Sequence, residues 1–306
     1  MPAPRVAVGP DAPAYAVEAV GRGGGTVVDL GQPADALVWL APNDPGGLRA
    51  ELAAAPDVAW VQLPFAGVEG YAAAGVFGDG RTWTCAKGAY AEPVAEHALL
   101  LALAGLRHLP ERVRARRWGA PAGLSLFDQP VTILGGGGIT TVLLSLLAPF
   151  RVQATVVRRH VAPLPGAVRV VEPSRLDQAL DGARVVFLAL SLTPETTGII
   201  GAPELATMGP QSWLVNVARG RHVRTEDLVE ALAAGAIAGA ALDVTDPEPL
   251  PEGHPLWDEP RCLITPHTAD TPEMVQPLLA RRIALNVARF AAGQPLEGLI
   301  DPALGY

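Results

Sequence analysis

Three polar side chains in the second half of the chain, Arg219, Glu248 and His267, have the types needed for acid–base chemistry on a carbonyl group. A guanidinium can grip a carboxylate or carbonyl oxygen through its fixed fork of donors. An imidazole can give or take a proton at that oxygen, and a carboxylate beside it favours the protonated ring and holds its orientation. Together with a nicotinamide cofactor, this set predicts hydride transfer coupled to proton transfer.

Each of these residues follows an apolar run that reads as a strand, in LVNVARG, LDVTDPEP and LITPHTAD. Active sites of parallel α/β sheets lie at the carboxyl ends of the strands, so the three positions favour a catalytic role. Taken singly, each also has a simpler interpretation. Arg219 could cap a loop, Glu248 could sit in a solvated turn, and His267 could bond the end of its strand. Only their joint placement favours catalysis.

Residues 131–159, VTILGGGGITTVLLSLLAPFRVQATVVRR, have the pattern strand, glycine turn, helix, strand. Gly135 and Gly137 fit the first two positions of the dinucleotide fingerprint G-x-G-x-x-G, whereas Thr140 stands at the third. Glycines allow a tight turn and the close approach of a pyrophosphate, and the following helix offers free N–H groups. The segment therefore predicts a dinucleotide site, with a plain tight turn as the alternative.

The second strand of this segment ends on Arg158 and Arg159, with His160 beside them. NAD enzymes place a carboxylate here, which accepts from the ribose 2′-hydroxyl and repels a 2′-phosphate. No Asp or Glu occurs from Gln153 to Pro165. Two guanidinium groups favour a phosphate instead, so we predict NADP(H) in preference to NAD(H) as cofactor. The alternative is that both arginines are solvated loop residues and the enzyme takes NAD.

The elements that must position these residues alternate along the whole chain. Strands are expected at residues 5–8, 26–29, 36–40 and 59–63, then at 131–134, 152–157, 168–171, 185–190, 213–218, 239–244 and 262–265. Helices are expected at residues 11–21, 46–55, 92–117, 139–147, 176–180, 203–208, 225–235 and 272–292, with an extended tail after the last. Short apolar strands between helices indicate parallel sheets covered on both faces.

The fold class predicted is therefore α/β, with two doubly wound parallel-sheet domains. Residues 1–96 and 274–306 are expected to form a substrate domain, because the long last helix can return the chain to the first sheet. Residues 97–273 are expected to form the dinucleotide-binding domain.

Composition excludes several other classes of protein. The chain has 306 residues, 49% of them hydrophobic, and a formal charge of −8 with scattered basic residues. We therefore expect no nucleic-acid partner and no membrane association. The two cysteines, Cys85 and Cys262, fit no metal or disulfide spacing, and the first residues lack a signal-peptide pattern. A cytoplasmic protein without a metal is the expectation.

Several motifs together resemble the D-isomer-specific 2-hydroxyacid dehydrogenase family. They are SLTPETTG, LVNVARG, EALAAGAIAGAALDV, DPEPLPEGHPLW and ITPHTA, with AWVQLPFAGVEGY in the first half. The resemblance covers nearly the whole chain. It implies a flavodoxin-like substrate domain, a Rossmann nucleotide-binding domain, an active site in the cleft between them, and a homodimer. It also implies an NAD(P)-dependent oxidoreductase that interconverts a small 2-oxo acid and its 2-hydroxy acid.

The same resemblance assigns roles to individual residues. Arg219 looks like the family's substrate-binding arginine, Glu248 like its acidic partner and His267 like its acid/base. The remaining assignments are a pyrophosphate loop (Gly135, Gly137, Gly138 and Ile139), a cofactor-flanking loop residue (Thr193), a nicotinamide-binding carboxylate (Asp243) and a substrate-carboxylate loop (Ala66 and Gly67). The simpler alternatives are a strand-end cap for Asp243 and an ordinary turn for the last pair.

Departures from the family pattern leave other functions within the family possible. Thr140 replaces the third glycine, and Ala189 and Ser191 replace a frequent His and Pro. Trp39 is similar to a substrate-facing Trp of glyoxylate and hydroxypyruvate reductases, but a core aromatic is the equal alternative. A weakly catalytic or non-catalytic nucleotide sensor, like the family's corepressors, and the 3-phosphoglycerate dehydrogenase branch are the other functions considered. Formate dehydrogenases share this fold but carry Gln where Glu248 stands, so the sequence does not favour that activity.

Overall fold

The computed structural model describes residues 2–302, and the chain divides into two compact units. One unit is formed by Met1–Tyr90 with Thr271–Tyr306, and the other by Ala91–Asp270. Both divisions fall a few residues before the domain boundaries predicted after residues 96 and 273. The roles of the two units, as substrate domain and dinucleotide-binding domain, stay predictions at this point.

The first unit contains a five-stranded parallel sheet in the order β2-β1-β3-β4-β5. Its strands are β1 (Arg5–Gly9), β2 (Thr26–Val28), β3 (Ala36–Trp39), β4 (Trp60–Gln62) and β5 (Thr82–Thr84). This is the flavodoxin-like order. The central strands β3 and β4 are buried along their whole length, as continuous apolar runs in a parallel sheet should be.

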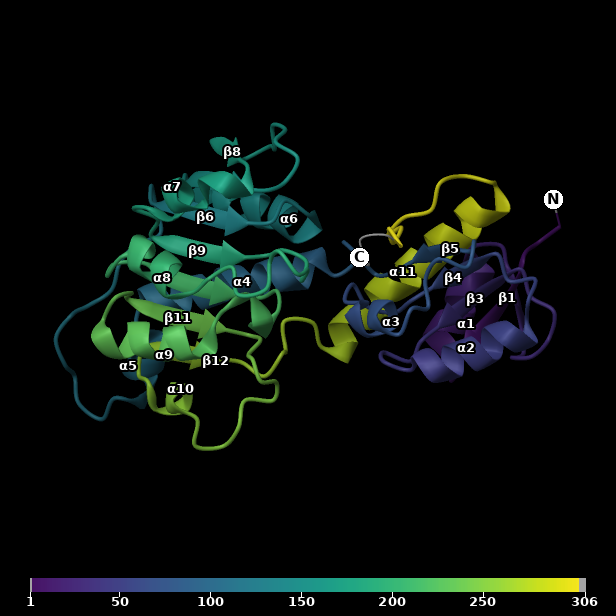
Figure 1. Ribbon diagram of the computed structural model, residues 1–306, viewed down its shortest axis with the longest axis horizontal. Coiled ribbons are helices and arrows are strands. Elements are labelled where there is room, and N and C mark those ends of the chain that lie inside the picture. The colour runs from purple at the N-terminus through teal and green to yellow at the C-terminus, as the bar shows by residue number, and fades with distance from the viewer. Residues whose placement is uncertain (1, 303–306) are drawn as a thin grey trace. The chain divides into compact units, whose positions relative to one another are not determined.

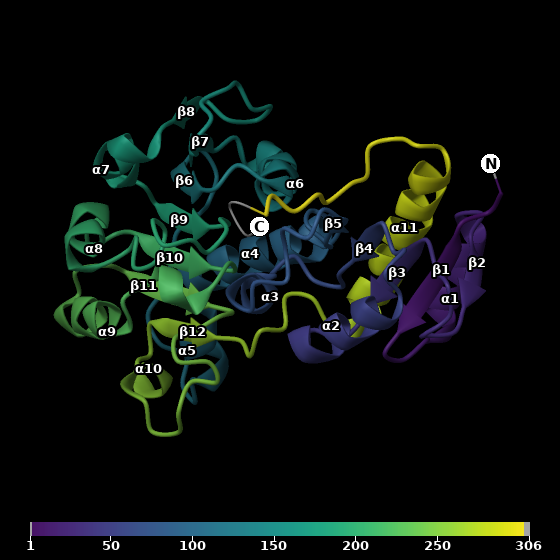
Figure 2. The same ribbon diagram turned by 45° about the vertical axis from the view of Figure 1, so that its right-hand side comes forward.

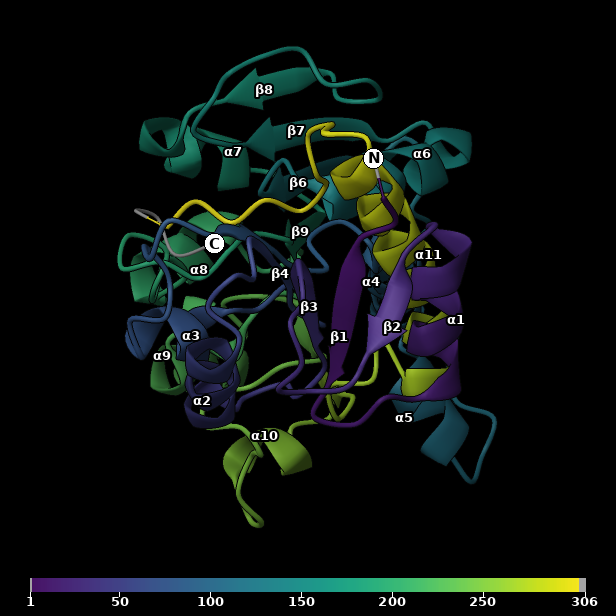
Figure 3. The same ribbon diagram turned by 90° about the vertical axis from the view of Figure 1, so that its right-hand side faces the viewer.

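Helices cover both faces of this sheet (Figure 3). α1 (Ala14–Arg22) and α11 (Pro272–Ala291) pack on one face, and α2 (Pro45–Ala54) and α3 (Glu69–Ala73) pack on the other. α11 thus returns the chain to the first sheet, as its length suggested. Buried Arg282 of α11 donates a hydrogen bond to the carbonyl of Cys85, and the tail pairs with β5 where Ile300 N donates to Trp83 O.

The second unit contains a seven-stranded parallel sheet in the order β12-β11-β10-β9-β6-β7-β8 (Figure 1). Its strands are β6 (Pro130–Leu134), β7 (Gln153–Val157), β8 (Arg169–Val171), β9 (Val185–Leu188), β10 (Trp213–Asn216), β11 (Gly239–Leu242) and β12 (Cys262–Ile264). β6 lies between β9 and β7, so the strand order reverses beside it. Ligands of doubly wound sheets bind at this reversal. The predicted fold class, two parallel-sheet α/β domains, is confirmed.

Figure 2 shows the helices of the second unit on the two faces of its sheet. One face is covered by α4 (Ala91–Leu106) and α6 (Gly138–Leu147), and the other by α7 (Leu176–Leu180), α8 (Ala202–Met208) and α9 (Thr225–Ala234). The short α10 (Pro255–Asp258) precedes β12. α7 has the bounds that the sequence predicted.

The single long helix predicted over residues 92–117 is wrong. The structure has two helices there, α4 and α5 (Leu109–Arg114), separated at His108, whose backbone is left-handed with φ 50°. Pro110 lies in the first turn of α5, where its missing N–H leaves no bond unmade. In one continuous helix the same proline would clash with the preceding turn. Pro110 was therefore the signal in the sequence for this break.

Residues 2–302 contain neither a candidate membrane-spanning helix nor a candidate metal centre. No helix within residues 2–302 is long and apolar enough to cross a membrane. The same residues hold no group of three or more His, Cys, Asp or Glu side chains placed to bind a metal ion. Cys85 and Cys262 are free and buried, and burial raises the pKa of the Cys262 thiol to about 12.

Candidate functional site

The carboxyl ends of the seven parallel strands share one edge of the second sheet, and most of the predicted site residues lie there. In strand order across the sheet they are His267 after β12, Asp243 after β11, Arg219 after β10, Thr193 after β9, Gly135 after β6 and Arg158 after β7. Residues as far apart in the chain as Gly135 and His267 therefore share one edge of the sheet.

His267 and Glu248 are in direct contact. The imidazole Nδ1 lies 2.6 Å from Glu248 Oε1, and the two side chains are 46% and 40% exposed. The backbone of His267 is left-handed, with φ 49°, and its N–H donates to Asp243 O at 2.8 Å. Because Nδ1 faces the carboxylate, Nε2 is the ring nitrogen left for proton exchange with another group.

Arg219 follows β10 on a tightly held turn. The side chain of Asn216 donates to Arg219 O at 2.9 Å and accepts from Ala218 N at 3.0 Å. The next residue, Gly220, has no room for a side chain, because a Cβ atom there would overlap the carbonyl of Thr245. The turn that carries Arg219 thus packs directly on the loop after β11. The half-buried guanidinium donates to Ala218 O at 2.7 Å.

Asp243 is 2% exposed and accepts several hydrogen bonds at the end of β11. Thr265 Oγ1 donates at 2.6 Å, the backbone N–H groups of Thr268 and Ala269 donate at 2.9 and 3.1 Å, and His97 Nε2 lies 3.3 Å away. Burial acts to raise the pKa of this carboxyl, but these hydrogen bonds outweigh it and lower the pKa to about 2. The carboxylate therefore fixes the loop that contains His267.

Three residues of this region, His97, Thr265 and Asp270, were not predicted from the sequence as site residues. His97 of α4 reaches Asp243 and also lies 3.0 Å from Thr265 Oγ1. Asp270 lies in the same loop as His267, two residues after Thr268. Burial raises the pKa of its carboxyl, and the charges of His267, Asp243 and Arg219 also act on it. Asp270 follows directly on the ITPHTA motif, so that motif was the signal that could have found it.

The glycine turn after β6 has the shape that a pyrophosphate needs. Gly135 has φ 106°, and a Cβ atom there would overlap the carbonyl of Ala189. α6 begins at Gly138 with Gly137 as its N-cap, so the exposed end of the helix carries no side chain at either position. Thr140, in place of the third glycine, is fully buried and donates to Gly135 O at 2.9 Å. These residues fit a bound dinucleotide.

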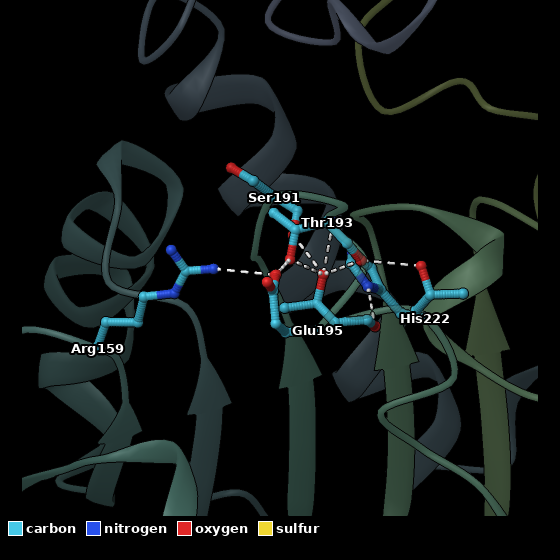
Figure 4. A network of polar contacts seen from close by, with 7 residues as sticks. Arg159, Ser191, Thr193, Glu195 and His222 are labelled. Carbon is cyan, nitrogen blue, oxygen red and sulfur yellow. Dashed lines mark hydrogen bonds and ion pairs between the residues drawn. The ribbon is translucent and has the colours of Figure 1, made fainter. Parts of the chain in front are cut away.

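The two arginines after β7 have different surroundings. Arg158 lies along the glycine turn, because a Cβ atom on Gly136 would come within 2.7 Å of its Cδ. Gly136, which was not among the predicted site residues, leaves room for the Arg158 side chain because it has no Cβ atom. Arg159 instead forms an ion pair with Glu195, at 3.3 Å between Nη2 and Oε2 (Figure 4). The segment around the arginines lacks a carboxylate, but the fold supplies one from 36 residues further along.

The predicted residues of the first unit follow its own strands. Trp39 ends β3 and is 3% exposed within a hydrophobic core cluster. Ala66 and Gly67 lie in the loop between β4 and α3, where Ala66 is exposed. Tyr71 of α3 donates to Ala41 O at 2.6 Å, which joins this region to the loop after β3.

Comparison with known proteins identifies the family. Residues 97–269 match the family model described as D-isomer specific 2-hydroxyacid dehydrogenase, NAD binding domain. The chain belongs to this dehydrogenase family. The matched range contains the glycine turn and Arg219, Glu248 and His267. The family resemblance noted from the sequence motifs is therefore confirmed.

Relatives of the chain agree with this assignment. It is 39% identical over 257 residues to an uncharacterized protein in the proB 3′ region of Corynebacterium melassecola, covering 82% of this chain and 84% of the relative. It is 36% identical to glyoxylate/hydroxypyruvate reductase A of Serratia proteamaculans, over 58% of this chain and 56% of the reductase.

A solved structure is similar along nearly the whole chain. It is a D-isomer specific 2-hydroxyacid dehydrogenase from Xanthobacter autotrophicus Py2, in complex with NADPH and MES. The TM-score is 0.87 at 27% identity, and the match covers 99% of this chain and 100% of that one. As a member of the family, the chain is an NAD(P)-dependent oxidoreductase of 2-hydroxy acids, which confirms the predicted enzyme class.

Proposed function

We propose that this dehydrogenase reduces a small 2-oxo acid, of the size of glyoxylate or hydroxypyruvate, with NADPH preferred over NADH. The observation that carries the proposal is the 2.6 Å contact between His267 and Glu248 on the sheet edge that also holds the glycine turn. The name of the Serratia reductase supports the substrate class, and the NADPH in the Xanthobacter structure supports the cofactor.

The catalytic residues are proposed to divide the reaction as follows. A bound nicotinamide would supply the hydride to the carbonyl carbon. His267 donates the proton to the carbonyl oxygen through Nε2, and Glu248 stabilises the imidazolium and fixes the ring. Arg219 holds the substrate through its guanidinium, which pairs with a carboxylate or a carbonyl oxygen. Oxo acid, NADPH and one proton give hydroxy acid and NADP⁺, so charge and electrons balance.

The remaining assignments are proposals of the same kind. Gly135, Gly137, Gly138 and Ile139 would hold the pyrophosphate, Thr193 and Asp243 would contact the cofactor, and Arg158 with Arg159 would bind the 2′-phosphate. Ala66 and Gly67 would hold the substrate carboxylate through backbone N–H groups. The burial of Trp39 supports the core role for its indole, and a substrate-facing role stays a prediction.

We also propose a cytoplasmic homodimer. Large apolar side chains are exposed on α5 and on the segment after it, which is unusual for a surface that meets only water. Val113 is 70% exposed and Trp118 is 98% exposed. Light scattering on the purified full-length chain should give twice the mass of one subunit.

A turnover assay with glyoxylate, hydroxypyruvate and longer 2-oxo acids tests the function. Each acid is combined with NADH and with NADPH, and absorbance of the reduced cofactor is followed. The proposal expects the highest kcat/KM for one of the two small acids with NADPH. Turnover restricted to longer acids, or a preference for NADH, would contradict it. Nucleotide binding without turnover of any acid would instead favour the sensor alternative.

A further inference from the structure

The ion pair between Arg159 and Glu195 lies beside the proposed site of the cofactor's ribose and has no part in the chemistry described above. Arg159 Nη2 and Glu195 Oε2 are 3.3 Å apart, and Thr193 Oγ1 donates to the same carboxylate oxygen at 2.7 Å (Figure 4). The hydroxyl of Thr193, assisted by the charge of Arg159, lowers the pKa of the Glu195 carboxyl. This side chain is therefore ionised at neutral pH.

The loop that carries Glu195, residues 190–197, is held in place from inside the protein by His222. The imidazole is fully buried, with Nδ1 2.9 Å from Thr196 O and Nε2 3.2 Å from Leu190 O. The ring thus lies between two carbonyls that flank Glu195 in the loop and donates a hydrogen bond to at least one of them (Figure 4). Because the loop is fixed, it holds the carboxylate of Glu195 close to Arg159.

Arg158 differs from Arg159 in its charge environment. Its guanidinium makes no ion pair or hydrogen bond with any residue in the part of the chain that the structure describes, 2–302. A 2′-phosphate, which carries close to two negative charges at neutral pH, would thus meet one uncompensated guanidinium and one that is already neutralised. It would also meet the negative charge of Glu195 itself.

We propose that Glu195 is a specificity-determining residue that competes with the cofactor's 2′-phosphate for Arg159 and so limits the preference for NADP(H) over NAD(H). The inference rests on the proposed function, because it takes Arg158 and Arg159 as the ribose site. Without a 2′-phosphate the carboxylate neutralises Arg159. With one bound, Arg159 must be shared or released by Glu195.

The size of the effect follows from exposure. The side chains of Arg159 and Glu195 are 44% and 71% exposed, so water and salt screen the competition. We expect removal of the Glu195 charge to tighten NADP⁺ binding by about three- to tenfold at low ionic strength. Binding of NAD⁺, which lacks the phosphate, should change by less than about twofold.

The test is isothermal titration calorimetry of NADP⁺ and of NAD⁺ on the full-length protein and on Glu195→Gln. Glutamine removes the charge but keeps an oxygen that accepts from Thr193, so the loop should keep its structure. The expected result is a higher ratio of the NAD⁺ dissociation constant to the NADP⁺ dissociation constant. The gain should shrink as salt is raised to about 0.5 M, because charges at a surface are then screened.

Asp128→Asn is the matched control. Asp128 forms an exposed ion pair with Arg151 at 2.7 Å, and both lie before β6 and β7, at the opposite edge of the same sheet. The variant makes the same change of net charge, and asparagine tolerates the left-handed backbone of residue 128, φ 61°. It should leave both dissociation constants unchanged.

Each other outcome has a definite meaning. Unchanged or weaker NADP⁺ binding in Glu195→Gln overturns the inference, and so does an equal gain in the control. Equal tightening of both cofactors overturns it as well, because the gain would not depend on the phosphate. A wild-type protein that binds neither cofactor overturns the proposed function too. Because binding is measured, an error in the proposed oxo acid does not affect the test.

Discussion

The ends of β10, β11 and β12 and the ends of β6, β7 and β9 share one sheet edge but are constructed differently. At the first group a buried carboxylate, Asp243, holds the loop of His267 through three donors of that loop, and Gly220 packs the turn of Arg219 directly against the loop after β11. At the second group the charged side chains are Arg158, Arg159 and Glu195, and the last two are 44% and 71% exposed.

The difference reflects what each region is proposed to do. Proton transfer needs an imidazole held at a fixed distance from the reacting oxygen. The side chain of His267 is itself half exposed, and the buried carboxylate of Asp243 fixes the loop that carries it. Selection between two cofactors needs only a difference in charge near a phosphate, and exposed groups supply that. Changes in the first region should therefore alter rate or stability, and changes in the second should alter cofactor choice.

The largest effect is expected from His267→Ala. It removes the proposed proton donor, so kcat for oxo-acid reduction should fall by roughly a hundredfold or more with either cofactor. Steady-state kinetics with NADPH and NADH measure both rates. Glu248→Gln, which keeps a hydrogen-bond acceptor for Nδ1 but removes the charge, should lose only about tenfold. A kcat of His267→Ala within a few-fold of the wild-type value would contradict the catalytic role proposed for the first region.

Replacement of both Arg158 and Arg159 by alanine should change cofactor choice rather than chemistry. Loss of charge-assisted contacts to a 2′-phosphate should lower kcat/KM for NADPH by about ten- to a hundredfold, with little change for NADH. Arg151→Ala, at the amino-terminal edge of the same sheet, is the control and should do neither. Equal losses with NADH and NADPH would show that the pair supports the fold instead.

A smaller effect, on stability, is expected from Asp243→Asn. The ordinary pKa of Asp, 3.8, is lowered to about 2 in the folded chain, so the carboxylate stabilises the fold above pH 3.8. That contribution, about 2 kcal/mol, is lost as the pH falls from 3.8 toward 2. Urea unfolding should show the variant less stable at pH 7 and nearly equal to wild type near pH 2. If the difference in unfolding free energy between wild type and variant did not change with pH, the charge of Asp243 would not be its cause.

Much of the fold could be predicted from local patterns. Each predicted strand has a counterpart in one of the two sheets, because short apolar runs between helices are read from neighbouring residues alone. β5, α3 and α10 were missed, since three to five residues give too short a pattern. The break at His108 could have been predicted from Pro110, because a proline inside a helical pattern ends or kinks the helix just before it.

The sequence by itself determined which side chains lie at the carboxyl edge of the second sheet. A residue directly after an apolar strand must lie at the carboxyl end of that strand, and parallel strands share this edge, so Arg219, Asp243 and His267 could be placed before any contact was known. The same spacing placed the glycine turn after β6 and the two arginines after β7, while their roles toward a cofactor stay predictions.

Only the tertiary structure decided which of these side chains meet. Glu195 reaches Arg159 across 36 residues, and His97 reaches Thr265 across 168. Those contacts depend on the strand order, which sets β9 beside β6, and on the packing of α4 against the sheet. Strand order and helix packing follow from the burial of whole faces, a property of the entire chain. No local stretch of sequence records them, which is why the sequence could not reveal that Glu195 lies beside Arg159.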